Sequence, residues 1–180
     1  MTDWLLLTGG ASSRLGEDKA NVEVAGRSLL EHARASIATS DPYATVHVLG
    51  ADYPGGPAAA VVAGLPLCES AIIGVLAVDM PFAHIALARV RDAVRRDPEA
   101  EAWIPIDDRG RQQWLCAAYL RNALDESARS RSDWSGEPFG RLVGELESVD
   151  VPIDIGVSLL DVDTPADLDR ARRASTQREQ

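Results

Sequence analysis

The sequence predicts a three-layer α/β protein, in which a mostly parallel, twisted sheet carries helices on both faces. Uninterrupted apolar runs at residues 4–7 and 72–78 are typical of strands buried on both sides. Segments with helical periodicity alternate with such runs, as in βαβ units with right-handed crossovers. A glycine-rich loop directly follows the first run, and ligands of such sheets bind beyond the carboxyl ends of the strands.

Length and charge narrow the class of protein. The 180 residues suffice for one domain with a full core, so we expect a single domain over residues 1–180 whose tail frays from about residue 175. The net charge of −10 argues against a nucleic-acid-binding protein, which needs a basic surface. No apolar window reaches the roughly 18 residues of a membrane span, and the acidic start lacks the basic region of a signal peptide. We therefore expect a cytoplasmic protein that binds neither nucleic acid nor a membrane.

The first part of the chain alternates strand and helix patterns. Residues 4–7 are too uniformly apolar to have a solvated face, which favours a central strand. Ser28 and Glu31 form a capping-box pattern that predicts a helix over residues 28–39. The short β-branched stretch at residues 45–49 predicts the next strand.

The middle of the chain continues the alternation. Pro57 suits the first position of a helix over residues 57–65. Residues 72–78 are the clearest strand pattern, and residues 85–96 have helical periodicity with their arginines on the outer face. The apolar stretch at residues 102–106 ends in a polar turn and predicts another strand.

Shorter elements complete the prediction. Residues 114–120 favour a strand, residues 121–129 a helix and residues 139–146 a short helix. Residues 149–152 predict an edge strand, where a proline is tolerated. The last helix is expected to start at Pro165, which follows a capping threonine.

The loop after the first strand reads Thr8-Gly9-Gly10-Ala11-Ser12-Ser13-Arg14-Leu15-Gly16-Glu17-Asp18-Lys19. Its glycines let backbone N–H groups approach phosphate oxygens closely. Ser12 can donate a hydrogen bond, and Arg14 and Lys19 can neutralise phosphate charge. The spacing differs from both a P-loop and a Gly-x-Gly-x-x-Gly dinucleotide loop. The pattern predicts a binding site for a nucleoside triphosphate, and the alternative is a glycine-rich turn whose cations are only solvated.

This loop resembles the signature of the molybdenum cofactor guanylyltransferases, nucleotidyltransferases that join GMP to molybdopterin on a Rossmann-like fold. Gly9-Gly10 and Asp18-Lys19 favour the guanylyl branch, because the related cytidylyltransferases usually carry Ala-Gly and Pro-Lys there. The resemblance implies catalytic roles for Lys19, Arg14 and Asp79. It also implies a set of nucleotide-binding residues: Leu7, Gly9, Gly10, Ser12, Arg14, Lys19, Asp52, Gly56, Pro57 and Asp79.

Asp79 is the strongest candidate metal ligand. It ends the apolar run of residues 72–78, at the edge where phosphates are expected, and Mg²⁺ binds one or two carboxylates together with phosphate oxygens. Val78-Asp79-Met80-Pro81 resembles the Cys-Asp-x-Pro segment of the family, whose aspartate is the Mg²⁺ ligand. The alternative is an aspartate that caps the turn before Pro81.

Asp161 and Asp163 alternate in the sequence, so an extended backbone would place both carboxylates on one side. Either of them could complete the metal site or hold the second substrate. The following residues, 164–168, resemble a Thr-Pro-Glu-Asp-Leu segment of the family. Guanylyltransferases often have Asn-x-Asn before that segment, so the two aspartates lean toward the cytidylyl relatives. Asp163 could also be only an acid near a helix N-terminus.

Gly56 and Pro57 begin a stretch that resembles the Gly-Pro-Leu-Ala-Gly segment beside the nucleotide in the family, with Ala60 in place of its inner glycine. Residues 50–56 form a shorter connection than the family usually has. An aspartate ahead of this segment contacts guanine in relatives, and Asp52 is the only candidate in the short connection.

The cysteines and histidines give no further site. Cys68 and Cys116 form no Cys-x-x-Cys pair and are expected to be small buried side chains. The histidines at positions 32, 47 and 84 show no metal-ligand spacing, which argues against a zinc site.

The residues themselves predict a phosphate-rich nucleotide site. The family resemblance implies a Mg²⁺-dependent enzyme that transfers GMP from GTP to the phosphate of molybdopterin and releases pyrophosphate. The resemblance also implies transient contact with molybdoenzymes or cofactor-biosynthesis proteins. One alternative is a CTP- or sugar-phosphate-using nucleotidyltransferase on the same fold. Another is a non-catalytic nucleotide-binding paralogue.

Overall fold

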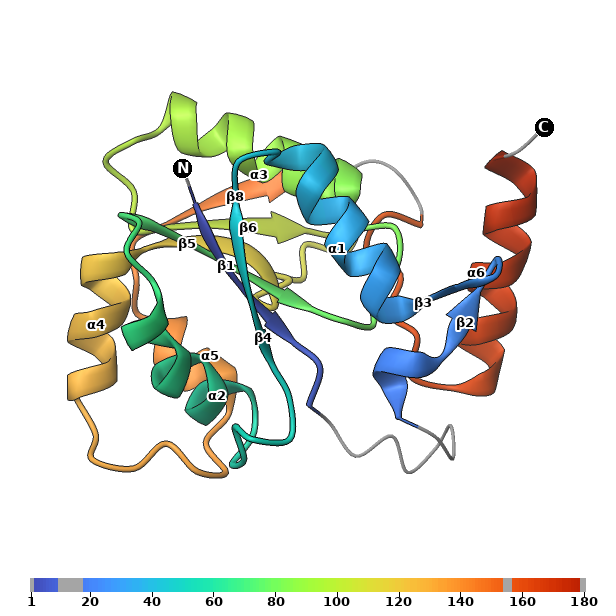
Figure 1. The fold of residues 1–180 in the computed structure, drawn as a ribbon. Coiled ribbons are helices and arrows are strands. Elements are labelled where there is room, and N and C mark those ends of the chain that lie inside the picture. Colours follow the sequence, from blue (N-terminus) through green and yellow to red (C-terminus); the bar gives the residue numbers. More distant parts are fainter. Residues whose placement is uncertain (1, 10–17, 154–156, 179–180) are drawn as a thin grey trace.

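The computed structural model describes residues 2–9, 18–153 and 157–178, and a six-stranded sheet lies at its centre (Figure 1). From one edge to the other the strands are β4 (Thr45–Leu49), β1 (Asp3–Leu7), β5 (Ile72–Ala77), β7 (Cys116–Leu120), β6 (Ala102–Ile106) and β8 (Ser148–Pro152). Neighbouring strands are parallel, except that β7 runs antiparallel to both β5 and β6. The predicted α/β class with a mostly parallel sheet is confirmed.

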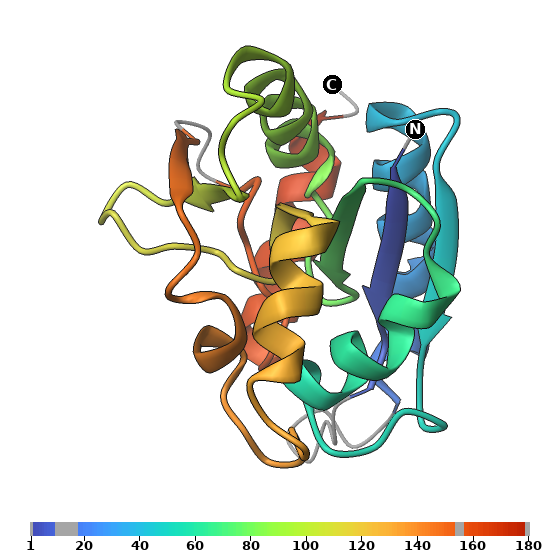
Figure 2. The ribbon, with the colours of Figure 1, turned by 90° about the vertical axis from the view of Figure 1, so that its left-hand side faces the viewer.

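Helices cover both faces of the sheet, as predicted. One face carries α1 (Leu29–Ser40) and α3 (His84–Arg96), and the other carries α2 (Pro57–Gly64), α4 (Arg121–Arg129) and α5 (Phe139–Val143). In Figure 2, α4 and α2 lie in front of the strands and α1 lies behind them. Side chains that alternate along β1 fill the two cores, Trp4 and Leu6 on one side and Leu5 and Leu7 on the other. None of the described helices is long and apolar enough to cross a membrane.

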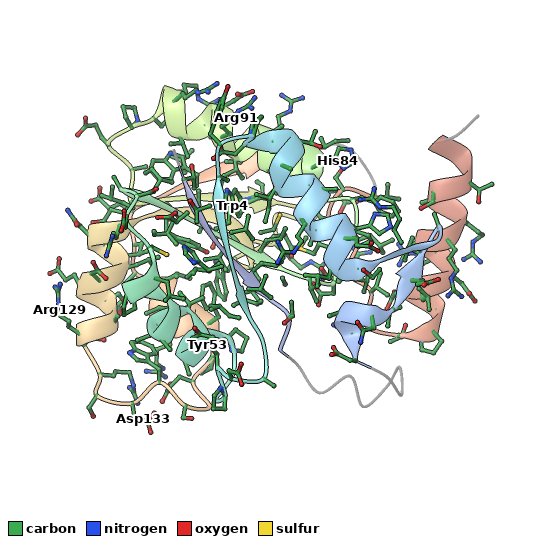
Figure 3. The ribbon with its side chains drawn as sticks, viewed as in Figure 1. Trp4, Tyr53, His84, Arg91, Arg129 and Asp133 are labelled. Atoms are coloured by element: carbon green, nitrogen blue, oxygen red, sulfur yellow. The ribbon has the colours of Figure 1, made fainter. Side chains whose placement is uncertain are left out.

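Trp4 fixes the packing of β1 against β5. It is paired with Gly74 in the sheet, and its indole lies in the middle of the fold (Figure 3). A Cβ atom at position 74 would lie 2.3 Å from the indole ring, so only glycine leaves room for this side chain. The close approach holds the two strands, and therefore the loops that follow them, in one register.

Local sequence signals account for the starts of two helices. The Oγ of Ser28 accepts a hydrogen bond from the Glu31 N–H at 3.2 Å, and the Glu31 carboxylate accepts one from the Ser28 N–H at 2.7 Å. This is the predicted capping box of α1. Pro57 occupies the first turn of α2, as predicted.

Two elements are shorter than predicted. Strand β7 begins at Cys116, because Cys116 N–H donates to the Gln113 carbonyl at 3.0 Å and closes a turn. Helix α5 ends at Val143 because Gly144, a poor helix former, follows it.

The C-terminal helix α6 (Pro165–Arg178) lies beside a small hairpin of β2 (Glu23–Val24) and β3 (Arg27–Ser28) (Figure 1). The Arg172 guanidinium donates to the Glu23 carbonyl at 3.2 Å, and Ala171 is fully buried. The helix extends past residue 175, where the sequence predicts fraying, because Ser175 is still buried against the rest of the chain. Two short 3-10 turns, η1 (Lys19–Asn21) and η2 (Leu65–Leu67), complete the described elements.

Candidate active site

The candidate site lies at the carboxyl ends of β1 and β5, which are adjacent and parallel. Leu7 is paired with Ala77, and the Val78 N–H donates to the Leu7 carbonyl at 2.9 Å. The chain leaves β1 for β4 through α1 on one face and returns to β5 through α2 on the other. Such a reversal in strand order is the switch point where ligands bind in α/β sheets.

Lys19 is the centre of the charged part of this site. Its ammonium donates to Asp79 Oδ2 at 2.7 Å and to Asp163 Oδ1. The side chains of Lys19 and Asp79 are only 15% and 18% exposed, whereas that of Asp163 is 54% exposed. Three segments that are distant in the sequence therefore bring one cation and two carboxylates together.

Hydrogen bonds to the backbone position these side chains. The Asp18 carboxylate accepts from the Ala20 N–H at 3.1 Å and caps η1, which starts with Lys19. The Val162 N–H donates to the Asp79 carbonyl at 2.9 Å, which attaches the segment of Asp163 to the loop after β5. In the first turn of α6, the Asp167 carboxylate accepts a hydrogen bond from the Thr164 hydroxyl at 2.7 Å.

The segment around Asp161 and Asp163 is not a strand. Residues 157–159 form a turn, and residues 160–163 belong to no helix or strand. Val162 is buried while its two acidic neighbours are exposed, so both carboxylates nevertheless lie away from the core.

The neighbouring carboxylates influence the pKa values of both Lys19 and Asp161. Burial alone would lower the pKa of Lys19, but the negative charge of Asp79 and the hydrogen bond to Asp163 outweigh it and raise the pKa. Desolvation raises the pKa of Asp161 to about 7, with the charges of Asp79 and Asp163 adding to the effect. Asp161 is exposed to solvent. We therefore attribute more of the rise in its pKa to the charges of Asp79 and Asp163 than to burial.

The donor set fits Mg²⁺. Carboxylate oxygens are the ligands that this hard cation takes from proteins. Asp79 and Asp163 already converge on one cation, the ammonium of Lys19, and Asp161 adds negative charge nearby. Asp79 with Asp163 or Asp161 would therefore hold the metal.

A cavity of about 400 Å³ opens on the other side of the β1 end, toward β4. It is lined by the ends of β1 and β4, by the connection after β4 and by the first turn of α2. Four of the described lining residues are glycines, and none of the described ones has a charged side chain: Leu7, Gly9, Leu49, Gly50, Ala51, Tyr53, Pro54, Gly55, Gly56, Pro57 and Ala60. Gly56, the N-cap of α2, has a φ of 89°, a conformation that favours glycine.

The predicted nucleotide-binding residues fall into four groups. Leu7, Gly9, Gly56 and Pro57 line the cavity, and Lys19 and Asp79 belong to the carboxylate cluster. Asp52 is exposed and does not line the cavity. Gly10, Ser12 and Arg14 lie outside the described residues.

Tyr53 lines the cavity, although it is not among the predicted nucleotide-binding residues. Figure 3 shows it in the connection between β4 and α2. The sequence feature that could have identified Tyr53 is an aromatic residue in a short loop, directly after a strand at the ligand-binding edge of the sheet.

The lysine–carboxylate cluster lies at the switch point between β1 and β5, and the glycine-lined cavity lies on the β4 side of the same strand end. Such an arrangement suits an α/β enzyme that binds a phosphorylated nucleotide. Residues 4–148 match the family described as MobA-like NTP transferase domain. The chain belongs to this family of nucleotidyltransferases. The matched range includes Lys19 and Asp79 and ends before Asp163.

Solved structures share the fold at low sequence identity. Molybdopterin-guanine dinucleotide biosynthesis protein A from Archaeoglobus fulgidus has a TM-score of 0.73 and 21% identity, with 97% of this chain and 99% of that one covered. A 4-diphosphocytidyl-2C-methyl-D-erythritol synthase from Anaerococcus prevotii has a TM-score of 0.70 and 13% identity, with 97% and 96% covered. A 2-C-methyl-D-erythritol 4-phosphate cytidylyltransferase from Thermus thermophilus has a TM-score of 0.65 and 18% identity, with 96% and 98% covered. No match was found among curated protein sequences.

Proposed function

We propose that the protein transfers GMP from GTP to the phosphate of molybdopterin and releases pyrophosphate, in a reaction that requires Mg²⁺. The observation that carries this proposal is the convergence of Lys19, Asp79 and Asp163 next to the glycine-lined cavity at the end of β1. Gly9-Gly10 and Asp18-Lys19 support the guanylyl branch.

In this proposal the base and the phosphates of the nucleotide bind on opposite sides of the β1 end. The base enters the cavity, where the lining offers peptide groups and apolar surface rather than charge. The phosphates pass Gly9 toward β5 and reach Lys19 and the carboxylates. The order β4-β1-β5 in the sheet supports this path, because β1 lies between the cavity and Asp79.

The reaction is a displacement at the α-phosphorus of GTP. A phosphate oxygen of the acceptor forms a bond to this phosphorus, and the bond to the bridging oxygen of the β-phosphate breaks. The acceptor oxygen is already anionic, so the step needs positioning and charge stabilisation more than a general base. Bound Mg²⁺ would neutralise charge on the phosphates, held by Asp79 with Asp163 or Asp161.

Lys19 stabilises the charge that develops on the leaving pyrophosphate. An ammonium group has three hydrogens, and described carboxylates accept two of them. The third is directed to a phosphate oxygen in the proposed complex. A group that gains its contact as charge develops lowers the barrier more than it strengthens binding.

Pyrophosphate release measured with GTP, CTP or ATP, in the presence of Mg²⁺ and molybdopterin, tests this function. Release with GTP that depends on molybdopterin supports the proposal. Release with CTP alone would contradict the guanylyl assignment and keep the enzyme class. Thermal stabilisation by a nucleotide without any release would identify a non-catalytic binder instead.

A cytidylyltransferase is the second candidate, and Asp161 and Asp163 favour it. These aspartates stand where guanylyltransferases often have asparagines. Two of the structurally similar proteins carry cytidyl compounds in their names. The same nucleotide series decides between the two candidates. For the guanylyltransferase candidate, we also propose transient contact with molybdoenzymes or cofactor-biosynthesis proteins, which would receive the product.

A further inference from the structure

A second group of potential metal ligands lies at the opposite end of β1 from the nucleotide site. It consists of Asp3, His47 and Cys68, whose ligand atoms all lie within 4.8 Å of one another. Asp3 is the first residue of β1 and Leu7 is the last, so the two ends are roughly 13 Å apart at the usual rise of a strand. This group is therefore separate from Asp79 and the cavity.

The Asp3 carboxylate is fixed by its own surroundings. Its Oδ2 atom accepts hydrogen bonds from the Glu69 and Ser70 N–H groups at 2.6 and 2.7 Å. Asp3 is only 4% exposed. One oxygen thus anchors the turn before β5, and the other, Oδ1, faces His47.

His47 supplies a buried nitrogen that lacks a partner. Its Nε2 atom is inaccessible and has no hydrogen-bond partner among the described residues. The distance from Nε2 to Asp3 Oδ1 is 3.9 Å, longer than a hydrogen bond of 2.7–3.2 Å. Two ligands of one tetrahedral Zn²⁺, each at about 2.0–2.2 Å from the metal, are separated by roughly 3.3–3.5 Å. The observed spacing is closer to that of a ligand pair than to that of a hydrogen bond.

Cys68 completes the group with sulfur. Its side chain is buried, and its thiol donates a weak hydrogen bond to the Gly64 carbonyl at 3.8 Å. Burial, followed by the negative charge of Asp3, raises the pKa of Cys68 to about 11. Without a cation the thiol therefore stays protonated, and a bound cation would displace this proton to water.

We propose that Asp3, His47 and Cys68 bind a borderline divalent cation of the Zn²⁺ type, with water as a fourth ligand. Nitrogen, sulfur and carboxylate donors are the set that zinc takes, and a thiolate disfavours Mg²⁺ and Ca²⁺. The His47 side chain is 22% exposed and lies on the edge strand β4, so the group lies close to the edge of the sheet. The cation would join β1, β4 and the connection into β5. The spacing argument against zinc considers ligands that are close in the sequence, whereas these three are distant in the sequence and meet only in the folded sheet.

Cobalt absorption spectroscopy on the full chain tests this site. Co²⁺ is added in the presence of a large excess of Mg²⁺, which occupies the carboxylates of the nucleotide site. The expected result is one Co²⁺ per chain, with tetrahedral absorption bands and a thiolate-to-cobalt charge-transfer band. Absence of the charge-transfer band from the wild-type protein at saturating Co²⁺ overturns the proposal.

A matched pair of cysteine variants assigns the sulfur ligand. Cys68→Ala should abolish the charge-transfer band, whereas Cys116→Ala, which removes the other buried thiol, should keep it. Retention of the band in Cys68→Ala, or its loss in Cys116→Ala alone, contradicts the assignment. Asp79→Asn should also keep the band, which separates this site from the nucleotide site.

A histidine variant provides a second measurement that does not depend on the fold of Cys68→Ala. Zn²⁺ should raise the Tm of the wild-type protein. It should raise the Tm of His47→Gln far less, with Zn²⁺ affinity weakened at least about tenfold. Equal stabilisation of both proteins by Zn²⁺ contradicts the proposal. This inference does not rest on the proposed function, because no readout involves nucleotide turnover.

Discussion

Two aspartates follow buried strands of the same sheet in nearly the same way and have different surroundings. Asp79 comes two residues after β5, and Asp107 comes directly after β6. Asp107 is bound by its own loop, because it accepts hydrogen bonds from the Arg109 and Arg111 N–H groups at 2.9 Å each. Asp79 instead accepts from Lys19, which is 60 positions away in the sequence.

The different hydrogen-bond partners of Asp107 and Asp79 indicate which of the two carboxylates is available to bind a ligand. Backbone N–H groups cannot leave Asp107 unless the turn itself opens. A flexible lysine can rearrange when phosphate and metal bind, so Asp79 can change partners at low cost. An acid after a buried strand is therefore a site candidate only when its partner comes from another segment. The predictions below test this distinction.

Asp79→Asn should have the largest effect. It removes the charge that would hold Mg²⁺, and loss of several kcal/mol of charge stabilisation corresponds to a fall of about 10³ or more in turnover. The half-buried position lies outside the core, so the fold should survive. Pyrophosphate release as a function of Mg²⁺ concentration measures the effect. Near-normal turnover at limiting Mg²⁺ would remove Asp79 from the mechanism.

Lys19→Ala should lower kcat by about 10²–10³, because one preorganised contact to developing charge is lost. KM for the nucleotide should change less, and Lys19→Arg should restore only part of kcat, since a planar guanidinium cannot replace a compact ammonium. Steady-state kinetics of both variants measure how the effect is divided between kcat and KM. An increase in KM with an unchanged kcat would show that Lys19 is a uniform binding contact.

Asp163→Asn should have a smaller effect, about tenfold in turnover, equivalent to ~1.4 kcal/mol. Its side chain is the exposed member of the cluster, so water can replace much of what the carboxylate provides. The comparison with Asp79→Asn under identical conditions is the measurement. Equal losses in the two variants would show that both aspartates are required as a unit.

Asp107→Asn should leave turnover unchanged and lower only stability. The Arg111 N–H, together with the Arg111 guanidinium and the Arg109 N–H, outweighs the opposing effect of burial and lowers the pKa of Asp107 below 3.8. A lowered folded-state pKa contributes stability that is fully present above 3.8 and is lost as the pH falls through the folded value.

Tm measurements on wild type and Asp107→Asn over a descending pH series check this sign. The gap between the two proteins should be constant near neutral pH and should close in acid. A gap that persists at the lowest pH, or a loss of turnover at neutral pH, would contradict the structural role of Asp107.

Much of the fold is predictable because its signals are local. The Ser28–Glu31 capping box and Pro57 mark helix starts through contacts within one turn. The antiparallel direction of β7 is a different case, since apolar residues do not encode strand direction. Only the short connection over residues 107–115 carries that information, because a parallel crossover needs about a dozen residues or more.

Part of the candidate site is also predictable, because local sequence patterns show where the strands end. Lys19 and Asp79 follow the ends of β1 and β5, and the ends of parallel neighbours meet at one edge. The contact of Asp163 with Lys19 is different, because it depends on the hydrogen bond between Val162 and the Asp79 carbonyl. No local pattern encodes such a bond between irregular segments. Likewise, the choice between Asp52 and Tyr53 as a cavity residue depends on the shape of one loop.

The hydrogen bond from the Val162 N–H to the Asp79 carbonyl attaches the C-terminal segment to the loop after β5. The segment supplies Asp163, and α6 holds it through Ala171 and through Arg172 on the β2–β3 hairpin. Local opening of this unit would release Asp163 from Lys19 while the sheet stays folded. Nucleotide and Mg²⁺ binding should oppose that opening, so amide hydrogen exchange at Val162 and in α6 should slow together, by a common factor.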